Sequence, residues 1–278
     1  MKRLLSIELQ KIWMNKASRI LTLTYFILLS FIALIAVIKF DIGPFKFHLA
    51  EMGIFNFPFI WHFNTYVAAW LKFFLAIVIV SMMANEYSYG TLKQNLIDGL
   101  SKKEFILSKF LTVVLFAFAS TVFVFVMSLA LGLCFSSYTE FSIIFSDLDY
   151  LLAFFVKLTG FFSFCLFLGI LVKRSAFALG FLLVWNIIEA IVRGTLAFKI
   201  FPDSDTDKKI TQFFPLESMS NLIANPGPRL SVVKNIGTQM GIETDADFSV
   251  DYFAVLIVLA WTFTFIYFSY KLLKNRDL

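Results

Sequence analysis

The sequence predicts an all-α membrane protein with six transmembrane helices and both chain ends in the cytoplasm. Hydrophobic residues make up 59% of the 278 residues and charged residues only 15%, whereas charged residues are about a quarter of an ordinary soluble domain. The mean hydropathy is +0.82. Six segments carry the roughly 20 mostly apolar residues that a helix needs to cross the hydrocarbon core. We therefore expect a single transmembrane domain over residues 1–278.

The six spans are expected at about residues 20–38, 61–83, 110–135, 150–172, 176–198 and 252–270. Three of them contain no charged residue, but the second contains Lys72, the fourth Lys157, and the fifth both Glu189 and Arg193. A charge at the bilayer centre costs about 2.5–3.5 kcal/mol on insertion scales, so such residues are expected to pair or to line a watery cavity. Lys157 lies near the outer end of its span and is expected to reach toward the head groups.

The distribution of charge between the spans sets the predicted orientation. Lysine and arginine gather in segments 2–19, 93–109, 173–174 and 271–276, which six spans place on one side of the membrane. Most acidic residues fall in the segments that would lie on the other side. Because cytoplasmic loops carry the excess of basic residues, both termini are expected inside the cell.

Residues 1–17 are expected to form a separate interfacial helix. Leu4, Leu5, Leu9, Ile12 and Trp13 recur at helical spacing against Lys2, Glu8, Lys11 and Lys16. Such a helix lies flat on a membrane, with its basic side toward the cytoplasm. The alternative is an ordinary basic flank that only sets topology.

The segment between the fifth and sixth spans, residues 199–250, is expected to be a helical outer loop. Prolines at 202, 215, 226 and 228 break it, because proline ends or kinks a helix. Between two of them the apolar residues Leu216, Met219, Leu222 and Ile223 are spaced as on one helix face. This pattern suits a short amphipathic helix that dips into the outer leaflet.

The loop between the second and third spans, residues 85–110, is predicted to be helix, break, helix. Gly90 opens a segment in which Leu92, Leu96 and Ile97 repeat at helical spacing, and Gly99 supplies a left-handed stop. Ser101 and Glu104 then form an S-x-x-E capping box that starts the next helix. Lys109 is expected to extend toward the head groups. A short amphipathic helix here would fit a groove in a soluble partner; the alternative is a structured loop without a partner.

This loop resembles the one in type-2 ABC exporter permeases. The resemblance is carried by Glu86, the Gly90-Thr91-Leu92 sequence, the short apolar helix and the later Lys109, together with the topology. It implies a coupling helix that contacts a separate ATPase subunit. The implied contact residues are Glu86, Gly90, Thr91, Leu92, Asn95, Leu96 and Ile97. Where that family often has a proline and an arginine after the helix, this sequence has Gly99-Leu100-Ser101-Lys102.

The resemblance also implies a substrate path flanked by the second and fifth spans. Asn64, Lys72, Asn186, Glu189 and Arg193 are the polar residues expected along it. Glu189 and Arg193 are one helical turn apart and suit an ion pair. Lys72 and Glu189 fall at similar depths, which permits a contact between them. The alternative is a structural ion pair between packed helices.

The absence of catalytic motifs limits what the chain itself is expected to do. There is no G-x-x-x-x-G-K-[ST] motif, so ATP and Mg are expected on the partner ATPase and no cofactor on this chain. H-E-x-x-H and G-x-S-x-G are also missing, so no catalytic residue or metal ligand is predicted and the chain is not expected to be an enzyme. His62 is expected to be an interfacial side chain.

We therefore expect a permease subunit of an ATP-driven exporter in a bacterial inner membrane. Its expected partners are two ABC ATPase subunits, a second permease copy or sister permease, and the lipid bilayer, with no nucleic acid. One alternative is a scaffold, or a secretion- or motility-linked subunit, that keeps the permease fold but moves no substrate. Another is an intramembrane enzyme that uses Glu189 and Lys72 as acid and base. The substrate, the direction of transport and the choice between homodimer and heterodimer stay open.

Overall fold

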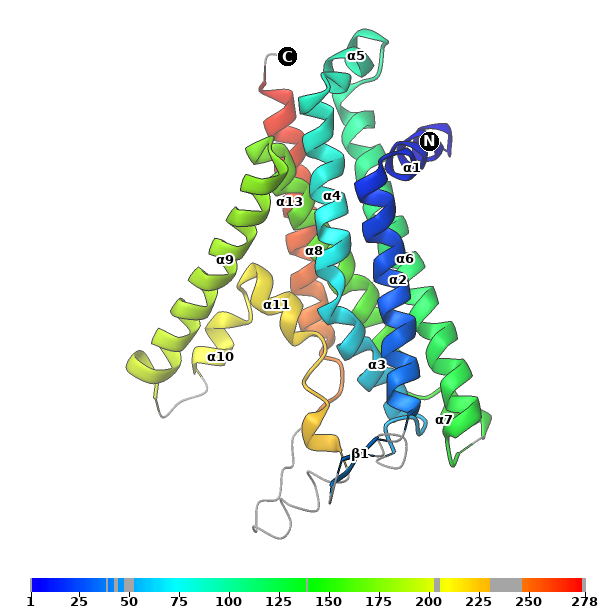
Figure 1. Ribbon diagram of the computed structural model, residues 1–278. Helices are drawn as coiled ribbons and strands as arrows, with labels where there is room; N and C mark the ends of the chain where they lie inside the picture. Colours follow the sequence, from blue (N-terminus) through cyan, green and yellow to red (C-terminus); the bar gives the residue numbers. More distant parts are fainter. Residues whose placement is uncertain are drawn as a thin grey trace.

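The computed structural model of the chain describes residues 2–38, 40–42, 45–47, 53–138, 140–202, 206–230 and 247–276. The described part is a bundle of long helices with one short hairpin (Figure 1). Part of the predicted outer loop lies outside the described residues, as do five of the acidic residues expected on the outer side: Glu51, Asp203, Asp205, Glu243 and Asp245.

The elements, in chain order, are α1 (Lys2–Met14), α2 (Lys16–Val37), β1 (Phe40–Ile42), β2 (Phe45–Phe47), α3 (Phe59–Trp70), α4 (Lys72–Ser88), α5 (Thr91–Ile97), α6 (Lys102–Phe135), α7 (Phe141–Ile144), α8 (Asp149–Val172), α9 (Ser175–Thr195), η2 (Leu196–Ile200), α10 (Thr206–Thr211), α11 (Pro215–Asn221), η3 (Gly227–Arg229) and α13 (Tyr252–Lys274). The interfacial helix expected at residues 1–17 is present as α1, which is separated from α2 by a break at Asn15. Figure 1 views α1 nearly end-on while α2 runs down the picture, so the two helices cross.

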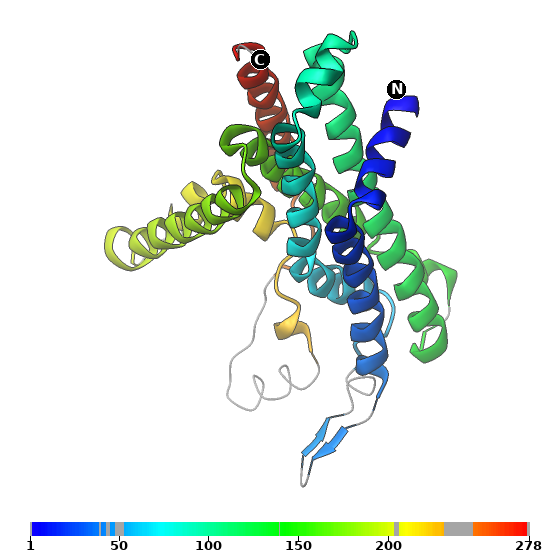
Figure 2. The same ribbon diagram turned by 45° about the horizontal axis from the view of Figure 1, so that its top comes forward.

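Helix α8 is the centre of the bundle. It is apolar on every side, as expected of a helix buried all round, and it packs against α4, α6, α9 and α13. By contrast α9 buries only Ala178, Leu182 and Glu189. Figures 1 and 2 both show α9 leaning away from the other helices, and in Figure 1 α10 and α11 lie between it and the rest of the bundle. Most of its apolar surface is therefore exposed.

Four or five of the predicted spans correspond to described helices that are long and apolar enough to cross a membrane. Four such stretches are 102–135, 141–172, 175–200 and 252–274, and the bent pair of α3 and α4 adds a fifth if it is one span. Helix α2 matches the first predicted span but is not among these helices within the described part of the chain. Six spans therefore stay a prediction.

The second predicted span is broken in the middle. Helices α3 and α4 meet at Leu71 with a bend of 47°. The Leu71 amide bonds to the Ala68 carbonyl, and the Phe74 amide to the Leu71 carbonyl, both at 3.1 Å. These i to i+3 bonds tighten the helix locally. The bend thus arises without the proline that usually marks one.

Both described chain ends lie at the end of the bundle that carries α5 (Figure 1). At the carboxyl end Lys102 Nζ donates to the carbonyls of Lys274 and Arg276, at 3.2 and 2.9 Å. Arg276 Nη1 in turn donates to the Ile170 carbonyl at 2.6 Å. An even number of crossings brings both chain ends to the same end of a bundle, as six spans would require.

The predicted capping box is confirmed at the start of α6. The Ser101 hydroxyl accepts from the Glu104 amide at 3.2 Å, and the Glu104 carboxylate accepts from the Ser101 amide at 3.0 Å. The helix that it starts has 34 residues, about 50 Å at 1.5 Å per residue. Because the hydrocarbon core is only about 30 Å thick, α6 is long enough to extend beyond it.

Two features differ from the prediction, the first of them at the end of the bundle opposite α5 (Figure 1). Strands β1 and β2 form an antiparallel hairpin, with Phe40 opposite Phe47. The amphipathic helix expected in the outer leaflet exists as α11, but its apolar face is buried in the bundle, where Met219 and the following Leu222 and Ile223 are covered. Contacts of α11 with α8, α9 and α13 supply this cover.

Candidate functional site

A cluster of four charged side chains lies where α1, α4 and α6 meet. Lys109 Nζ of α6 lies 2.5 Å from Glu8 Oε2 of α1 and 2.5 Å from Glu86 Oε1 of α4. Lys11 Nζ of α1 lies 2.9 Å from the same Glu86 oxygen and 3.3 Å from Glu8 Oε1. Two carboxylates face two ammonium groups, so the four-charge cluster is neutral overall. It joins three helices that are far apart in the sequence.

Three of the four charged side chains in the cluster are buried, so it is not a surface ion pair. The Lys109 side chain is 0% exposed, and both carboxylates are nearly as covered. The expectation that Lys109 extends toward the head groups is therefore wrong: the two carboxylates hold it inside. Burial by itself would lower the pKa of Lys11, but the hydrogen bond to Glu86 and the charges of both carboxylates outweigh it, and this pKa is raised above 10.5. Lys11 therefore stays protonated at neutral pH.

The cluster also holds the short helix α5 in place. Thr91 Oγ1 donates to Glu86 Oε2 at 2.5 Å, and Asn95 Nδ2 approaches the same oxygen at 3.5 Å. Gly90 takes a φ of +68°, a left-handed conformation that glycine adopts at little cost. Leu92 is buried against the bundle, and Leu96 packs beside it. Six of the seven predicted coupling residues thus attach α5 to the bundle.

The outward face of the same loop is carried by other side chains. Ile97 is 72% exposed and Tyr89, just before the helix, is 74% exposed. Lys93, Gln94 and Asp98 are exposed beside them. Of the predicted coupling residues, only Ile97 presents a large apolar side chain to solvent. Tyr89 was missed by the sequence analysis, although its place one residue before Gly90 marks it as part of the turn.

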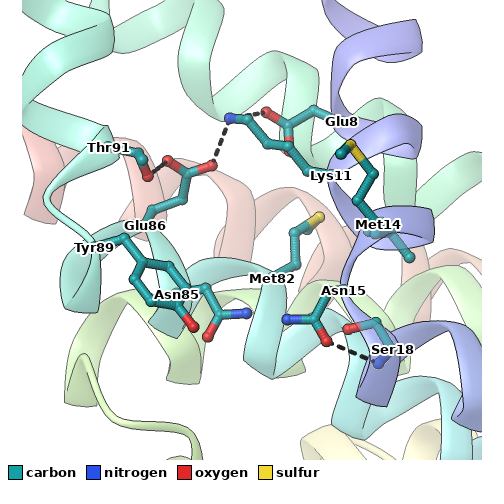
Figure 3. Close-up of a pocket in the computed structure, with 11 residues that line it drawn as sticks. Glu8, Lys11, Met14, Asn15, Ser18, Met82, Asn85, Glu86, Tyr89 and Thr91 are labelled. Carbon is teal, nitrogen blue, oxygen red and sulfur yellow. Dashed lines mark hydrogen bonds and ion pairs between the residues drawn. The ribbon is translucent and has the colours of Figure 1, made fainter.

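A cavity of about 290 Å³ opens between α1 and the end of α4. Figure 3 shows Lys11 reaching over it toward Glu86, with Asn15 and Asn85 pointing toward one another from the two helices. Ile12 and Met82 supply apolar walls. Glu8, Lys11 and Glu86 of the four-charge cluster also line this cavity.

The predicted path residues do not pair as expected. The Glu189 carboxylate accepts from the amides of Leu216 and Glu217, at 3.1 and 2.9 Å, and from the Trp185 indole at 2.6 Å. Arg193 pairs with Glu217 at 2.7 Å instead of with Glu189. The reason is that the first amides of α11 have no partner within their own helix and need an acceptor. Neither a Lys72–Glu189 contact nor a Glu189–Arg193 pair is formed.

Asn64 and Lys72, both expected on the path, lie in different surroundings. Asn64 is buried and donates to the Ser128 hydroxyl of α6 at 2.8 Å, so it ties α3 to α6. Lys72 lies at the start of α4, with its ammonium 4.3 Å from the centre of the Phe161 ring. Lys72 and Asn186 line a second cavity, of about 320 Å³, together with Lys157.

Lys157 and His62 are each buried, contrary to expectation. Lys157 is 4% exposed and donates to the Ser220 carbonyl at 3.1 Å, because the outer loop folds inward over it. His62 stacks on Tyr150 with ring centres 4.3 Å apart. Its Nε2 lies 2.8 Å from the Ala224 carbonyl, which can only accept, so Nε2 carries the proton and Nδ1 accepts from Arg229 at 3.1 Å.

Within the described ranges no group of three or more histidine, cysteine, aspartate or glutamate side chains is placed to hold a metal ion. The four to five long apolar helices are compatible with a multi-pass membrane protein. Over residues 26–278 the sequence matches the family described as protein of unknown function (DUF2705), and the chain belongs to that family. A comparison with curated proteins finds no match. A function has therefore to be argued from the geometry.

Proposed function

We propose that the chain is the membrane-spanning permease subunit of an ATP-binding cassette transporter, an exporter in a bacterial cytoplasmic membrane. The observation that carries the proposal is α5, a seven-residue helix at the tip of the α4–α6 hairpin. Its inner face is fastened to the bundle by Glu86 and Leu92, while Ile97 is exposed. A rigidly held helix with an apolar anchor suits a groove in a soluble partner.

The four-charge cluster gives this helix a means of moving the bundle. A partner that pushes α5 displaces Glu86 through Thr91, and Glu86 is bonded to Lys109 of α6 and Lys11 of α1. The push is therefore shared among three helices. In the proposed transporter a separate ATPase subunit holds ATP and Mg, and its closure on ATP supplies the push. Two such subunits and a second permease copy or sister permease complete the assembly.

The basic segments support the proposed orientation. Both described chain ends lie beside α5, and this end of the bundle carries the lysine- and arginine-rich segments 2–19, 93–109 and 271–276. Cytoplasmic ends of membrane proteins carry this bias. This bias supports the proposal that α5 lies on the cytoplasmic side, within reach of a cytosolic ATPase.

The test is co-purification in mild detergent with an ATPase encoded beside the gene. The wild-type chain is expected to retain the ATPase. Ile97→Asp puts a charge on the exposed anchor and is expected to release the ATPase while the permease still elutes as a folded species. Tyr138→Asp, at the opposite end of the bundle and also exposed, is the matched control and should retain it.

Two results would refute the proposal. One is a wild-type chain that retains no ATPase, and the other is Ile97→Asp that retains as much as Tyr138→Asp. The rate of ATP hydrolysis by the bound ATPase distinguishes a transporting permease from a scaffold. A permease is expected to change the hydrolysis rate of the bound ATPase in response to substrate, whereas a scaffold would leave it unchanged.

A further inference from the structure

Two lysines, Lys72 and Lys157, face one cavity beside the bend between α3 and α4. The cavity, of about 320 Å³, is lined by Tyr66, Ala69, Trp70, Lys72, Phe73, Lys157, Asn186 and Ser220. None of these residues is acidic. Lys72 comes from the start of α4, directly after the bend at Leu71, and Lys157 comes from the central helix α8. We name this the two-lysine cavity.

Lys157 lacks the partners that a buried ammonium group requires. An ammonium has three N–H donors, and within the described part of the chain Lys157 uses one of them, on the Ser220 carbonyl. That carbonyl is neutral and does not balance the charge. Since the side chain is only 4% exposed, bulk water does not solvate it freely. The remaining donors are left for whatever occupies the two-lysine cavity.

Lys72 adds a second positive charge with even less compensation. Its recorded partners among the described residues are aromatic: the Phe161 ring at 4.3 Å and the Phe73 ring at 5.8 Å. Such contacts are worth about 0.5–2 kcal/mol, less than an ion pair would supply in so apolar a place. The one acidic residue of α9, Glu189, is held by the backbone amides of α11. The described residues that line the cavity thus supply two cations and no carboxylate.

The rim of the cavity indicates what kind of anion fits. Trp70 is 68% exposed, and Phe73 is exposed beside it. The apolar outer surface of α9 continues from Asn186 along the helix, where Leu183 and Ile187 are exposed. An acidic head group placed between the lysines would leave an attached hydrocarbon tail along this apolar surface. A small hydrated anion would make no favourable contact with such an apolar rim.

We propose that the two-lysine cavity binds the carboxylate or phosphate head group of an anionic amphiphile. Lys72 and Lys157 neutralise the head group, and Asn186 contributes an amide that can donate a hydrogen bond. The inference that such an amphiphile is the transported substrate rests on the proposed transport function. The inference that the cavity binds it does not. An amphiphile can reach the cavity from within a bilayer, past Trp70.

The test uses 9,10-dibromostearate as probe and Trp70 as reporter, because bromine quenches tryptophan fluorescence at short range. The full chain is purified in a neutral detergent without any ATPase. The methyl ester of the same fatty acid has the same tail but no charge. The acid is expected to quench at a concentration at least tenfold lower than the ester, and this difference is expected to vanish in Trp70→Phe.

Variants then test the lysines. Lys72→Gln and Lys157→Gln are each expected to weaken quenching by the acid about tenfold, the effect of losing one charge-assisted hydrogen bond, and to leave the ester unchanged. Lys72→Arg keeps the charge and should keep the preference. Lys271→Gln, on the exposed surface of α13, is the matched control. If a glutamine variant does not fold, the comparison of acid with ester in the wild type still decides.

Three results would overturn the inference: equal quenching by acid and ester in the wild type, an acid preference that survives both lysine replacements, or an acid preference that survives Trp70→Phe. Competition with inorganic phosphate distinguishes a site for an amphiphile head group from a site for small free anions. If millimolar phosphate abolishes the preference for the acid, the cavity takes small anions and the amphiphile assignment is wrong. Because no ATPase is present, binding succeeds or fails independently of the proposed transporter assembly.

Discussion

Replacing Lys109 with methionine tests whether the four-charge cluster holds the bundle together. Methionine is of similar length and fits an apolar environment, so the change removes the charge with little change in volume. It leaves the carboxylates of Glu8 and Glu86 buried, with only the half-exposed Lys11 to balance both. Removing one partner of a buried ion pair typically costs about 3–5 kcal/mol, because the other charge is left uncompensated.

The cost should appear as a lower midpoint of thermal unfolding. For chains of this size 1 kcal/mol corresponds to roughly 2–4 °C, so the loss for Lys109→Met is expected to be on the order of 10 °C. The midpoint is measured in detergent by tryptophan fluorescence and by the fraction that still elutes as a folded species. The matched control is Lys103→Met, which lies earlier in the same helix and is exposed. It should shift the midpoint by less than about 2 °C.

A triple variant separates the charge effect from packing. Glu8→Gln and Glu86→Gln combined with Lys109→Met remove all three buried charges, and replacing a buried ionic group by neutral residues is often close to neutral. Most of the lost stability should therefore return. If Lys109→Met unfolds at the same temperature as Lys103→Met, or if the triple variant is less stable than Lys109→Met alone, the reasoning about the cluster is refuted.

Two further predictions concern helix contacts. In Gly169→Ala the new methyl would lie 3.0 Å from Met83 Cβ on α4, so the free energy of unfolding should fall by about 1–3 kcal/mol. Gly180→Ala, with nothing within 4 Å of the new methyl, should be neutral or slightly stabilising. Equal midpoints of thermal unfolding for the two variants would contradict this. Glu189→Gln removes the charge that accepts from the first amides of α11, so backbone hydrogen exchange over residues 216–221 should accelerate roughly tenfold or more. Unchanged exchange would show that α11 is held by its apolar face alone.

Local signals in the sequence were sufficient to predict the structure of the loop between α4 and α6. Gly90 and Gly99 both take positive φ values, +68° and +96°, and Ser101 with Glu104 closes the expected capping box. Each of these features depends on residues within a few positions of one another, so spacing alone defines them. The helix boundaries of α8 and α13 fall within a few residues of the predicted spans for the same reason.

Contacts between distant segments were not predictable from spacing. Glu8 and Lys109 are 101 positions apart, and no periodicity links them. The inward fold of α11 decides the partners of both Lys157 and Glu189, and a hydropathy pattern does not tell whether an amphipathic helix turns its apolar face to lipid or to protein. The bend at Leu71 has no proline or glycine beside it, so the residues around it give no warning.

The separation of Glu8 from Lys109 also fixes an order of events during synthesis. Glu8 is made among the first residues, but the ammonium that it pairs with is added 101 positions later. At about 5–20 residues per second, α1 waits roughly 5–20 s for α6 to be made. Until then the amino-terminal helix has no ion pair with α6 to dock on. The four-charge cluster can thus be completed only after the chain has been made as far as Lys109, just before the third predicted span.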